Sequence, residues 1–310
     1  MAHEVNIEKL MLASQKESTT FKNVPSSPVE INNVKEISRS AIHELVNRYY
    51  KHGFAVLDIK PGHVVINSVE IINIISKLLE LGSPFIPPLY QQGDYKAGVI
   101  SKISVDDELQ KDFLHPSFHK TRGLKLHSDG TLQKIGYIKT SIMYCKLPGV
   151  TGGDNTFFNA SGAFAALVCK DLSAAIALMH PMVFIRQANV NGCDDINHGP
   201  TFTIENGEIF SAYSVTETDR WENVKGVNGD DLARGINFLD LLARPNSPYF
   251  FQFKLTADQL LICANAKISH GRTPYTDSPS TRRCLYRSLF LQRPKFSINM
   301  PSGYASIPVC

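Results

Sequence analysis

The sequence predicts a mainly β fold, a sandwich of strands flanked by helices. Segments rich in β-branched and aromatic residues recur along most of the chain, separated by Gly, Pro and Asn turn signals. Helical periodicity is confined to the first part of the chain and to inserts between strands. With 310 residues, 43 % of them hydrophobic, the chain can bury a substantial core. One large domain is expected, because such folds often run past about 200 residues.

The first sixty residues divide into an arm and the start of this domain. Residues 1–34 are mostly polar and carry Ser-Pro and Asn-Asn turn signals, so we expect an N-terminal arm or cover strand with weak structure of its own. Residues 35–310 are expected to form a single domain with helical and loop inserts. Apolar residues recur with helical spacing over 38–52, and Gly53 can end that helix. The apolar run 54–59 predicts a buried strand.

The middle of the chain alternates turn signals with short apolar runs. A second helix is expected from a cap at Ser68 to Leu81. Residues 83–123 are irregular, and a connection of this length is either a lid over a site or a decorated surface loop. Asn206 and Gly207 predict a two-residue hairpin turn. The other expected elements are strands at 124–130, 137–145, 249–254, 260–264 and 284–291, a turn that leads into a strand within 148–158, helices at 162–168, 172–179 and 230–243, and polar loops at 188–200 and 214–229.

Charge and composition narrow the function classes. The 32 Lys and Arg nearly balance the 29 Asp and Glu, for a net charge of +3 without a basic run, so no nucleic-acid partner is expected. No apolar stretch approaches the roughly 18 residues of a membrane span, and the first residues do not resemble a signal peptide. The six Cys show neither C-x-x-C nor zinc spacing. We therefore expect a cytoplasmic protein with reduced thiols and no membrane association.

A candidate metal site lies on the strand expected over 124–130. Residues two apart on a strand face the same side, so His127 and Asp129 would project together. An imidazole beside a carboxylate, completed by a second His, forms the 2-His-1-carboxylate triad that binds Fe(II) and leaves positions open. Taken alone, such a pair is more often a His and an Asp in a polar turn, so a metal site needs support from other parts of the chain.

A second constellation lies towards the other end of the chain. An apolar strand beginning at Leu260 runs into a polar end that carries His270. Arg283 and Arg287 follow on one face of another expected strand. Buried guanidinium groups need an anion, and a dicarboxylate would suit a bidentate fork that Lys cannot reproduce. The alternative is a pair of surface charges on an edge strand.

In this order the motifs resemble the taurine dioxygenase and clavaminate synthase-like family of Fe(II)/2-oxoglutarate dioxygenases. His270 lies 141 residues after Asp129, and Arg283 lies 13 residues after His270; both separations suit that family. The resemblance covers residues 38–293 and implies a double-stranded β-helix, a distorted cupin-like jelly roll with iron at its open end. It is carried by His127-Ser-Asp129, Gly152-Gly153-Asp154, Asn265…His270-Gly271-Arg272 and Arg283-x-x-x-Arg287.

The resemblance also implies the cofactors and their residues. His127, Asp129 and His270 would ligate Fe(II), and Arg283 would bind the distal carboxylate of the cosubstrate 2-oxoglutarate. Arg287 falls where relatives hold either the cosubstrate or an anionic group of the prime substrate.

One position departs from the family pattern. The family often has Thr directly after Gly-Gly-Asp, in contact with 2-oxoglutarate, whereas here Asn155 fills that place and Thr156 follows. One step along a strand reverses the face, so only one of the two side chains can point at the cosubstrate. Position favours Asn155, with Thr156 as the alternative.

The activity implied is oxygenation of a small polar molecule, such as an amino acid or a biosynthetic intermediate. The enzyme would use O2 to hydroxylate or desaturate an unactivated C–H bond, releasing succinate and CO2. Because Asp129 is present, chlorination is not expected, since related halogenases have a small residue there. A carboxylate, phosphate or sulfonate on the substrate would suit Arg287. The alternative is a metal-binding jelly-roll protein without oxygenase activity, such as a sensor or scaffold.

Overall fold

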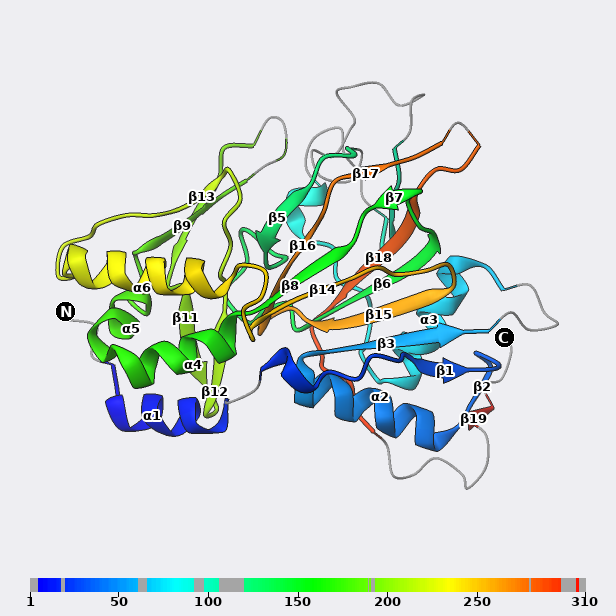
Figure 1. Cartoon of the computed structure of the whole chain (residues 1–310), viewed down its shortest axis with the longest axis horizontal. Coiled ribbons are helices and arrows are strands. Elements are labelled where there is room, and N and C mark those ends of the chain that lie inside the picture. Colours follow the sequence, from blue (N-terminus) through cyan, green and yellow to red (C-terminus); the bar gives the residue numbers. More distant parts are fainter. Residues whose placement is uncertain are drawn as a thin grey trace.

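Two sheets face each other at the centre of the protein (Figure 1). The structure is a computed structural model that describes residues 5–17, 20–60, 66–91, 98–105, 120–188, 190, 193–278, 280–296 and the backbone of 305–306. The larger sheet consists, in spatial order, of β1 (Val29–Ile31), β3 (Phe54–Ile59), β15 (Gln259–Ala264), β6 (Thr140–Leu147), β18 (Cys284–Phe290) and β4 (Ser101–Ile103). The smaller sheet consists of β14 (Phe250–Phe253), β8 (Asn155–Asn159), β16 (Ile268–Arg272) and β5 (Leu124–His127).

Neighbouring strands in both sheets are antiparallel, apart from the parallel pair β1 and β3. This arrangement confirms the predicted mainly β fold with flanking helices and the jelly-roll architecture. The short elements of the described chain are the 3-10 helices η1 (Phe21–Asn23) and η2 (Pro88–Gln91) and the strands β2 (Glu36–Ile37), β7 (Thr151–Gly152), β17 (Tyr275–Thr276) and β19 (Ala305–Ser306).

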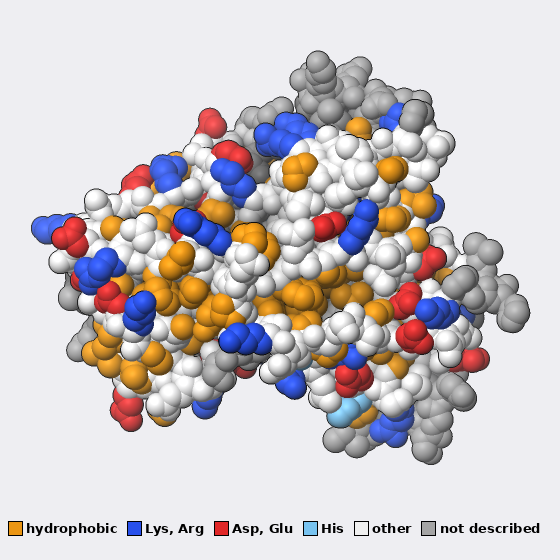
Figure 2. Space-filling view, viewed as in Figure 1, with side chains coloured by type: hydrophobic (Ala, Val, Ile, Leu, Met, Phe, Trp, Pro, Cys, Tyr) orange, Lys and Arg blue, Asp and Glu red, His pale blue; other side chains and the backbone are white. Residues whose placement is uncertain are grey.

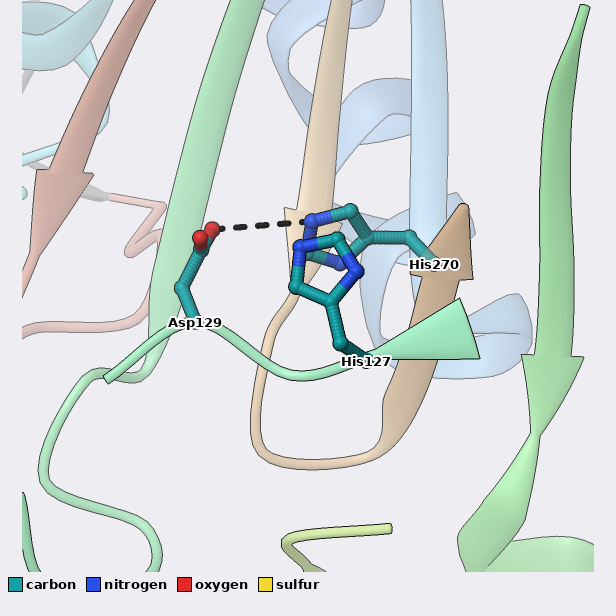
Figure 3. A group of neighbouring side chains, drawn as sticks. All are labelled: His127, Asp129 and His270. Atoms are coloured by element: carbon teal, nitrogen blue, oxygen red, sulfur yellow. Dashed lines mark ion pairs between the residues drawn. The ribbon is translucent and has the colours of Figure 1, made fainter. Parts of the chain in front are cut away.

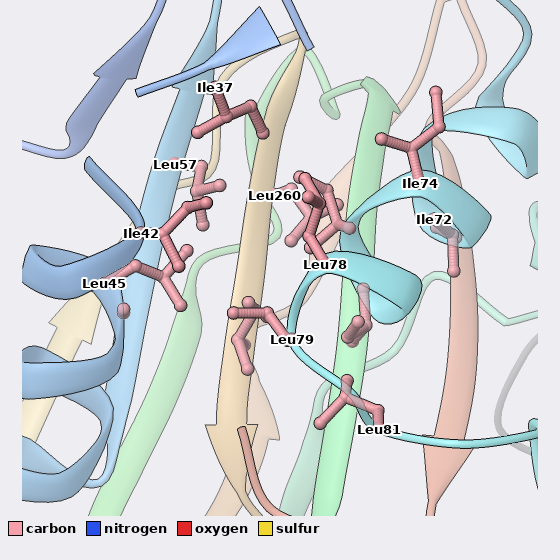
Figure 4. Close-up of a cluster of buried hydrophobic side chains, with 14 of the residues drawn as sticks. Ile37, Ile42, Leu45, Leu57, Ile72, Ile74, Leu78, Leu79, Leu81 and Leu260 are labelled. Carbon is pink, nitrogen blue, oxygen red and sulfur yellow. The ribbon is translucent and has the colours of Figure 1, made fainter. Parts of the chain in front are cut away.

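The outer face of the larger sheet is covered by two helices, α2 (Arg39–His52) and α3 (Ser68–Leu78). Figure 4 shows their Leu and Ile side chains packed against the sheet. Strand β15 is apolar on both faces: Leu260 and Ile262 belong to this outer cluster, whereas Leu261 and Cys263 belong to the cluster between the sheets. Burying one such Leu or Ile contributes about 1.5–3 kcal/mol, so the strand anchors both layers.

The helix ends follow local chemistry. As predicted, α2 ends at Gly53, which adopts φ +77°; a Cβ there would also lie 2.4 Å from Ile268 Cδ1. The predicted bounds of α3 are wrong at both ends. Its N-cap is Asn67, whose Oδ1 accepts from the Glu70 N–H, and the helix stops at Leu78 rather than Leu81. Asn is at least as good an N-cap as Ser, so the cap moves one residue earlier.

A second unit, here called the insert lobe, lies beside the sandwich, on the left in Figure 1. It has its own hydrophobic core. Its members are α1 (Ile7–Lys16), α4 (Ala160–Lys170), α5 (Leu172–Leu178), α6 (Gly229–Leu242), the three-stranded sheet β10 (Ile196–Gly199), β9 (Phe184–Gln187) and β13 (Asp219–Trp221), and the hairpin β11 (Phe202–Glu205) and β12 (Glu208–Ser211). The predicted hairpin turn is confirmed, with positive φ at Asn206 and Gly207.

Two expectations for the insert lobe and the arm are wrong. Residues 7–16 form helix α1, capped by Asn6, instead of an arm with weak structure. Strands β10 and β13 occupy stretches expected to be polar loops. Both depend on partners: Leu10 and Ala13 bury one face of α1 in the insert-lobe core, and β9 supplies the hydrogen bonds of both strands. The division of the chain into arm and domain stays a prediction.

The surface carries intermixed charges. In Figure 2, Lys and Arg lie among Asp and Glu, and hydrophobic side chains gather over the insert lobe. Exposed apolar residues of that lobe include Leu12 and Leu241. Within the described ranges, no helix is both long and apolar enough to cross a bilayer.

Candidate metal centre and cosubstrate pocket

Strands β5 and β16 of the smaller sheet bring two imidazoles together. His127 and His270 are directly opposed in the antiparallel register, and their ring centroids lie 4.4 Å apart. Opposed residues on such a pair have their Cβ atoms about 5 Å apart, so two side chains 143 positions apart in the chain become neighbours. The strand carrying His270 is separate from β15, because the chain turns after Ala264 and enters the opposite sheet.

Asp129 reaches the same point by a turn. We expected His127 and Asp129 on one face of a single strand, and this geometry is wrong. Strand β5 ends at His127, and Asp129 lies in the loop after it. Gly130, with φ +93°, allows that loop to bend back. Asp129 Oδ2 lies 3.6 Å from His270 Nε2 (Figure 3). The three side chains offer ligand atoms that all lie within 4.8 Å of one another.

The protonation states suit a divalent cation. Burial alone would raise the pKa of the Asp129 carboxyl, but the Arg287 guanidinium and the two imidazoles lower it to about 2. Burial lowers the pKa of His127, and burial with the neighbouring ring lowers the pKa of His270 to about 3. At neutral pH the cluster is therefore one carboxylate and two neutral imidazoles, the forms that bind metal.

Hydrogen bonding orients one of the imidazoles. His127 Nδ1 lies 2.9 Å from the Lys125 carbonyl oxygen, so this nitrogen carries the proton and donates. Nε2 of His127 is then left as the lone-pair nitrogen. Metal-bound His in proteins is held in this way, with the second nitrogen donating to a carbonyl or carboxylate.

A cavity of about 730 Å³ opens beside this cluster, between the two sheets. Its lining includes the three clustered side chains, Arg283, Arg287 and Asn155. Thr156 is not among the lining residues; its hydroxyl faces Gly271, where an added Cβ would lie 2.8 Å from Oγ1. Asn155, which its place in the sequence favours over Thr156, is therefore also the residue that lines the cavity.

The cavity wall away from the metal cluster holds buried donors. Within the described part of the chain, Arg283 Nη1, Asn155 Nδ2 and Arg272 Nε have no hydrogen-bond partner. Arg283 and Arg272 each lie about 5 Å from the Tyr275 ring, at 5.0 and 4.8 Å. Buried polar groups are almost always bonded in proteins, so a cluster of unbonded donors marks the place of an absent acceptor. A carboxylate fits this donor set.

Arg287 lies at the metal end. Its Nη1 donates to Asp129 Oδ1 at 2.6 Å, and both side chains are buried. It is therefore beside the metal cluster, where it is engaged with the carboxylate of Asp129. Sequence reasoning did not identify two further cavity residues, Tyr90 of η2 and Arg186 of β9. Tyr90 lies within the irregular stretch before the first motif, and Arg186 in a short strand that had no motif around it.

Comparison with known proteins identifies the family. Residues 16–289 match the model of the taurine catabolism dioxygenase TauD, TfdA family. The chain belongs to this family. It is an Fe(II)- and 2-oxoglutarate-dependent dioxygenase that oxidises a C–H bond of a small substrate and releases succinate and CO2. The alternative of a scaffold or sensor without oxygenase activity is not favoured.

The chain is similar to two named relatives and to two solved structures. The chain is 36 % identical over 255 residues to a uridine-5'-phosphate dioxygenase of Amycolatopsis, covering 82 % of this chain and 90 % of that one. It is 32 % identical over 219 residues to a protein of the same name from Streptomyces, covering 69 % and 76 %. An asparagine oxygenase in complex with Fe(II), 3-hydroxyasparagine and succinate has the same fold, with TM-score 0.58, 14 % identity and coverage of 92 % and 91 %. A taurine dioxygenase of Burkholderia xenovorans matches with TM-score 0.55, 15 % identity and coverage of 86 % and 88 %.

Proposed function

We propose that His127, Asp129 and His270 hold the Fe(II) of this dioxygenase. The observation that carries the proposal is the buried cluster itself, with ligand atoms within 4.8 Å and protonation states suited to metal. When bound, iron supplies the redox chemistry that couples oxidation of 2-oxoglutarate to oxidation of the substrate. The protein contributes orientation: Lys125 fixes the tautomer of His127, and Arg287 holds the Asp129 carboxylate.

For 2-oxoglutarate we propose that Arg283 binds the distal carboxylate, with Asn155 donating beside it. Both side chains are buried and line the cavity, and each has a donor atom without a partner among the described residues. Arg287, at the metal end, would lie near the other end of the cosubstrate. Thr156 is left out of this proposal because it does not line the cavity.

For the prime substrate we propose a nucleoside 5'-monophosphate, with uridine-5'-phosphate as the first candidate. Two relatives more than 30 % identical carry that substrate in their names. The cavity is rich in cationic side chains, which suits a phosphate dianion together with a dicarboxylate. These cations are Arg122, Lys125, Arg186, Arg272, Arg283 and Arg287, against the acids Asp129, Glu217 and Asp219. Its volume of about 730 Å³ is that of a small-molecule site.

The test separates cosubstrate from substrate. Anaerobic addition of Fe(II) and then 2-oxoglutarate should produce a weak visible charge-transfer band, since both must bind one metal for it to form. Under O2, uridine-5'-phosphate should stimulate succinate formation and give an oxidised product by mass spectrometry. Uridine, which lacks only the phosphate, is the matched control. Stimulation by uridine as strong as by its phosphate, or by an amino acid alone, would remove the nucleotide proposal.

The compartment we propose is the cytoplasm. The five Cys of the described residues are free thiols, whereas Cys310 lies outside the described residues. Free thiols suit a reducing compartment.

A further inference from the structure

The turn that carries Asp129 is held by side chains from two distant segments. Asn265 faces Asp129 with both ends of its amide: Oδ1 accepts from the Asp129 N–H at 2.7 Å, and Nδ2 donates to the Asp129 carbonyl at 3.1 Å. Arg186 holds the residues on either side, since Nη2 donates to the Ser128 carbonyl at 2.7 Å and Nη1 to the Gly130 carbonyl at 3.3 Å. Four backbone groups of a three-residue turn are thus bonded to side chains.

Arg186 belongs to the insert lobe, on β9, and its other edge faces Asp219. The two residues are opposed in the β9–β13 register, with Arg186 Nε 3.8 Å from Asp219 Oδ1. Asp219 Oδ2 in turn accepts hydrogen bonds from the Ser214 and Thr216 hydroxyls. Asp219 therefore ties Arg186 to the loop of residues 214–219.

That loop borders the cavity. Thr216, Glu217 and Thr218 line it together with Asp219, on the insert-lobe side. One buried guanidinium thus connects a cavity-lining loop of the insert lobe with the turn that presents Asp129. A Lys in this place has one donor group and cannot reach both carbonyls and the carboxylate, whereas the planar fork of Arg can.

We infer that Arg186 is a positioning residue for the metal centre: it sets the placement of the Asp129 carboxylate by clamping the Ser128 and Gly130 carbonyls to the insert lobe. The inference rests on the proposed metal site. Arg186 is not a ligand; it acts through the backbone of the turn. Loss of the clamp leaves two carbonyls without a donor and lets the turn relax, and residues that orient metal ligands typically affect metal affinity about 10- to 100-fold.

The experiment compares Arg186→Met, Arg186→Lys and the double variant Arg186→Met with Asp219→Asn. Arg186→Met alone leaves the buried Asp219 carboxylate without its cationic partner, which would lower the stability of the fold for a reason unrelated to the metal. The double variant removes that charge, and Arg186→Lys keeps a cation beside Asp219. Arg220→Met is the matched control, because Arg220 is an Arg on β13 that is about half exposed and pairs with Glu222.

Fe(II) affinity is measured by anaerobic titration, the charge-transfer band is recorded at saturating Fe(II) and 2-oxoglutarate, and the melting temperature is taken without metal. The double variant and Arg186→Lys should stay folded but melt somewhat below the unmodified protein, because the Ser128 and Gly130 carbonyls lose donors. At a temperature where they are fully folded, they should bind Fe(II) about 10-fold or more weakly, with a shifted or weakened band. Arg220→Met should change none of the three. Normal Fe(II) affinity and a normal band in the double variant would overturn the inference and leave Arg186 a purely structural residue.

His270→Ala separates the inference from the metal proposal on which it rests. If His270→Ala loses Fe(II) while the double variant keeps it, only the role of Arg186 fails. If His270→Ala keeps its Fe(II) affinity, the metal proposal itself fails, and the clamp with it.

Discussion

The two ends of the cavity differ in which polar groups are hydrogen-bonded within the protein. At the metal end, the Asp129 turn has its backbone bonded by Asn265 and Arg186, and the Asp129 carboxylate is paired with Arg287. At the far end, Arg283 and Asn155 bury donors that have no partner in the described part of the chain. The backbone of the turn at the metal end is thus bonded before anything binds, whereas Asp129 Oδ2 and His270 Nδ1 in the proposed ligands have no hydrogen-bond partner among the described residues. The donors at the far end lack an acceptor until an anion binds.

The largest effect is expected at the metal end from His270→Ala. Removal of one of three ligands should lower Fe(II) affinity by at least about 100-fold and abolish turnover, since loss of a residue that merely orients a ligand already costs up to that much. Anaerobic Fe(II) titration and succinate formation measure this. His198→Ala is the control, because His198 is an exposed His of the insert lobe. Full activity in His270→Ala would contradict the proposed triad.

At the far end, Arg283→Ala should raise the 2-oxoglutarate dissociation constant by about 100-fold. A buried carboxylate that loses its charged partner costs about 3 kcal/mol or more. Titration of the charge-transfer band at fixed Fe(II) gives the affinity. Arg282→Ala, in an exposed neighbour, should leave it unchanged. An unchanged dissociation constant in Arg283→Ala, together with a raised one in Arg282→Ala, would move the cosubstrate role to Arg282.

A third pair of variants contrasts the two ends directly, in the protein without metal or cosubstrate. Asn265→Ala should lower the free energy of unfolding by about 2 kcal/mol, because it leaves buried backbone groups of Asp129 and Ile138 without partners. Arg283→Met should lower it little or even raise it, because it removes a buried cation with an unpaired donor. Urea denaturation measures both. Equal losses would mean that, without cosubstrate, the Arg283 guanidinium stabilises the fold as much as the bonded Asn265 amide does.

The smallest effect is expected from Asn155→Ala, with about a 10-fold weaker binding of 2-oxoglutarate. One hydrogen bond to a charged group contributes about 1.5–3 kcal/mol, and the lower end applies where Arg283 still binds the same carboxylate. Thr156→Val, which keeps the side-chain shape, should have no effect, since Thr156 points away from the cavity. The same band titration applies. A larger effect of the Thr156 variant would reverse the assignment between the two neighbours.

The sequence by itself determined what depends on near neighbours and residue chemistry. Helix α2 with its Gly53 end, strand β3 and the Asn206-Gly207 hairpin all follow from spacing, turn preference and apolar runs. The order of the motifs around His127 and His270 was enough to indicate the family, because a metal triad restricts residue types at few positions. These are properties of short segments that no distant contact reverses.

Only the tertiary structure decided which side chains from distant parts of the sequence come into contact. Asp129 is brought to the triad by a turn that Asn265 and Arg186 hold, so strand alternation gave the right pair for an incorrect geometric reason. Arg287 meets Asp129, and α1 became a helix because the insert lobe offered it an apolar face. Such pairings join residues up to 158 positions apart. Their energies come from burial and partner choice in the folded chain, which local periodicity does not encode.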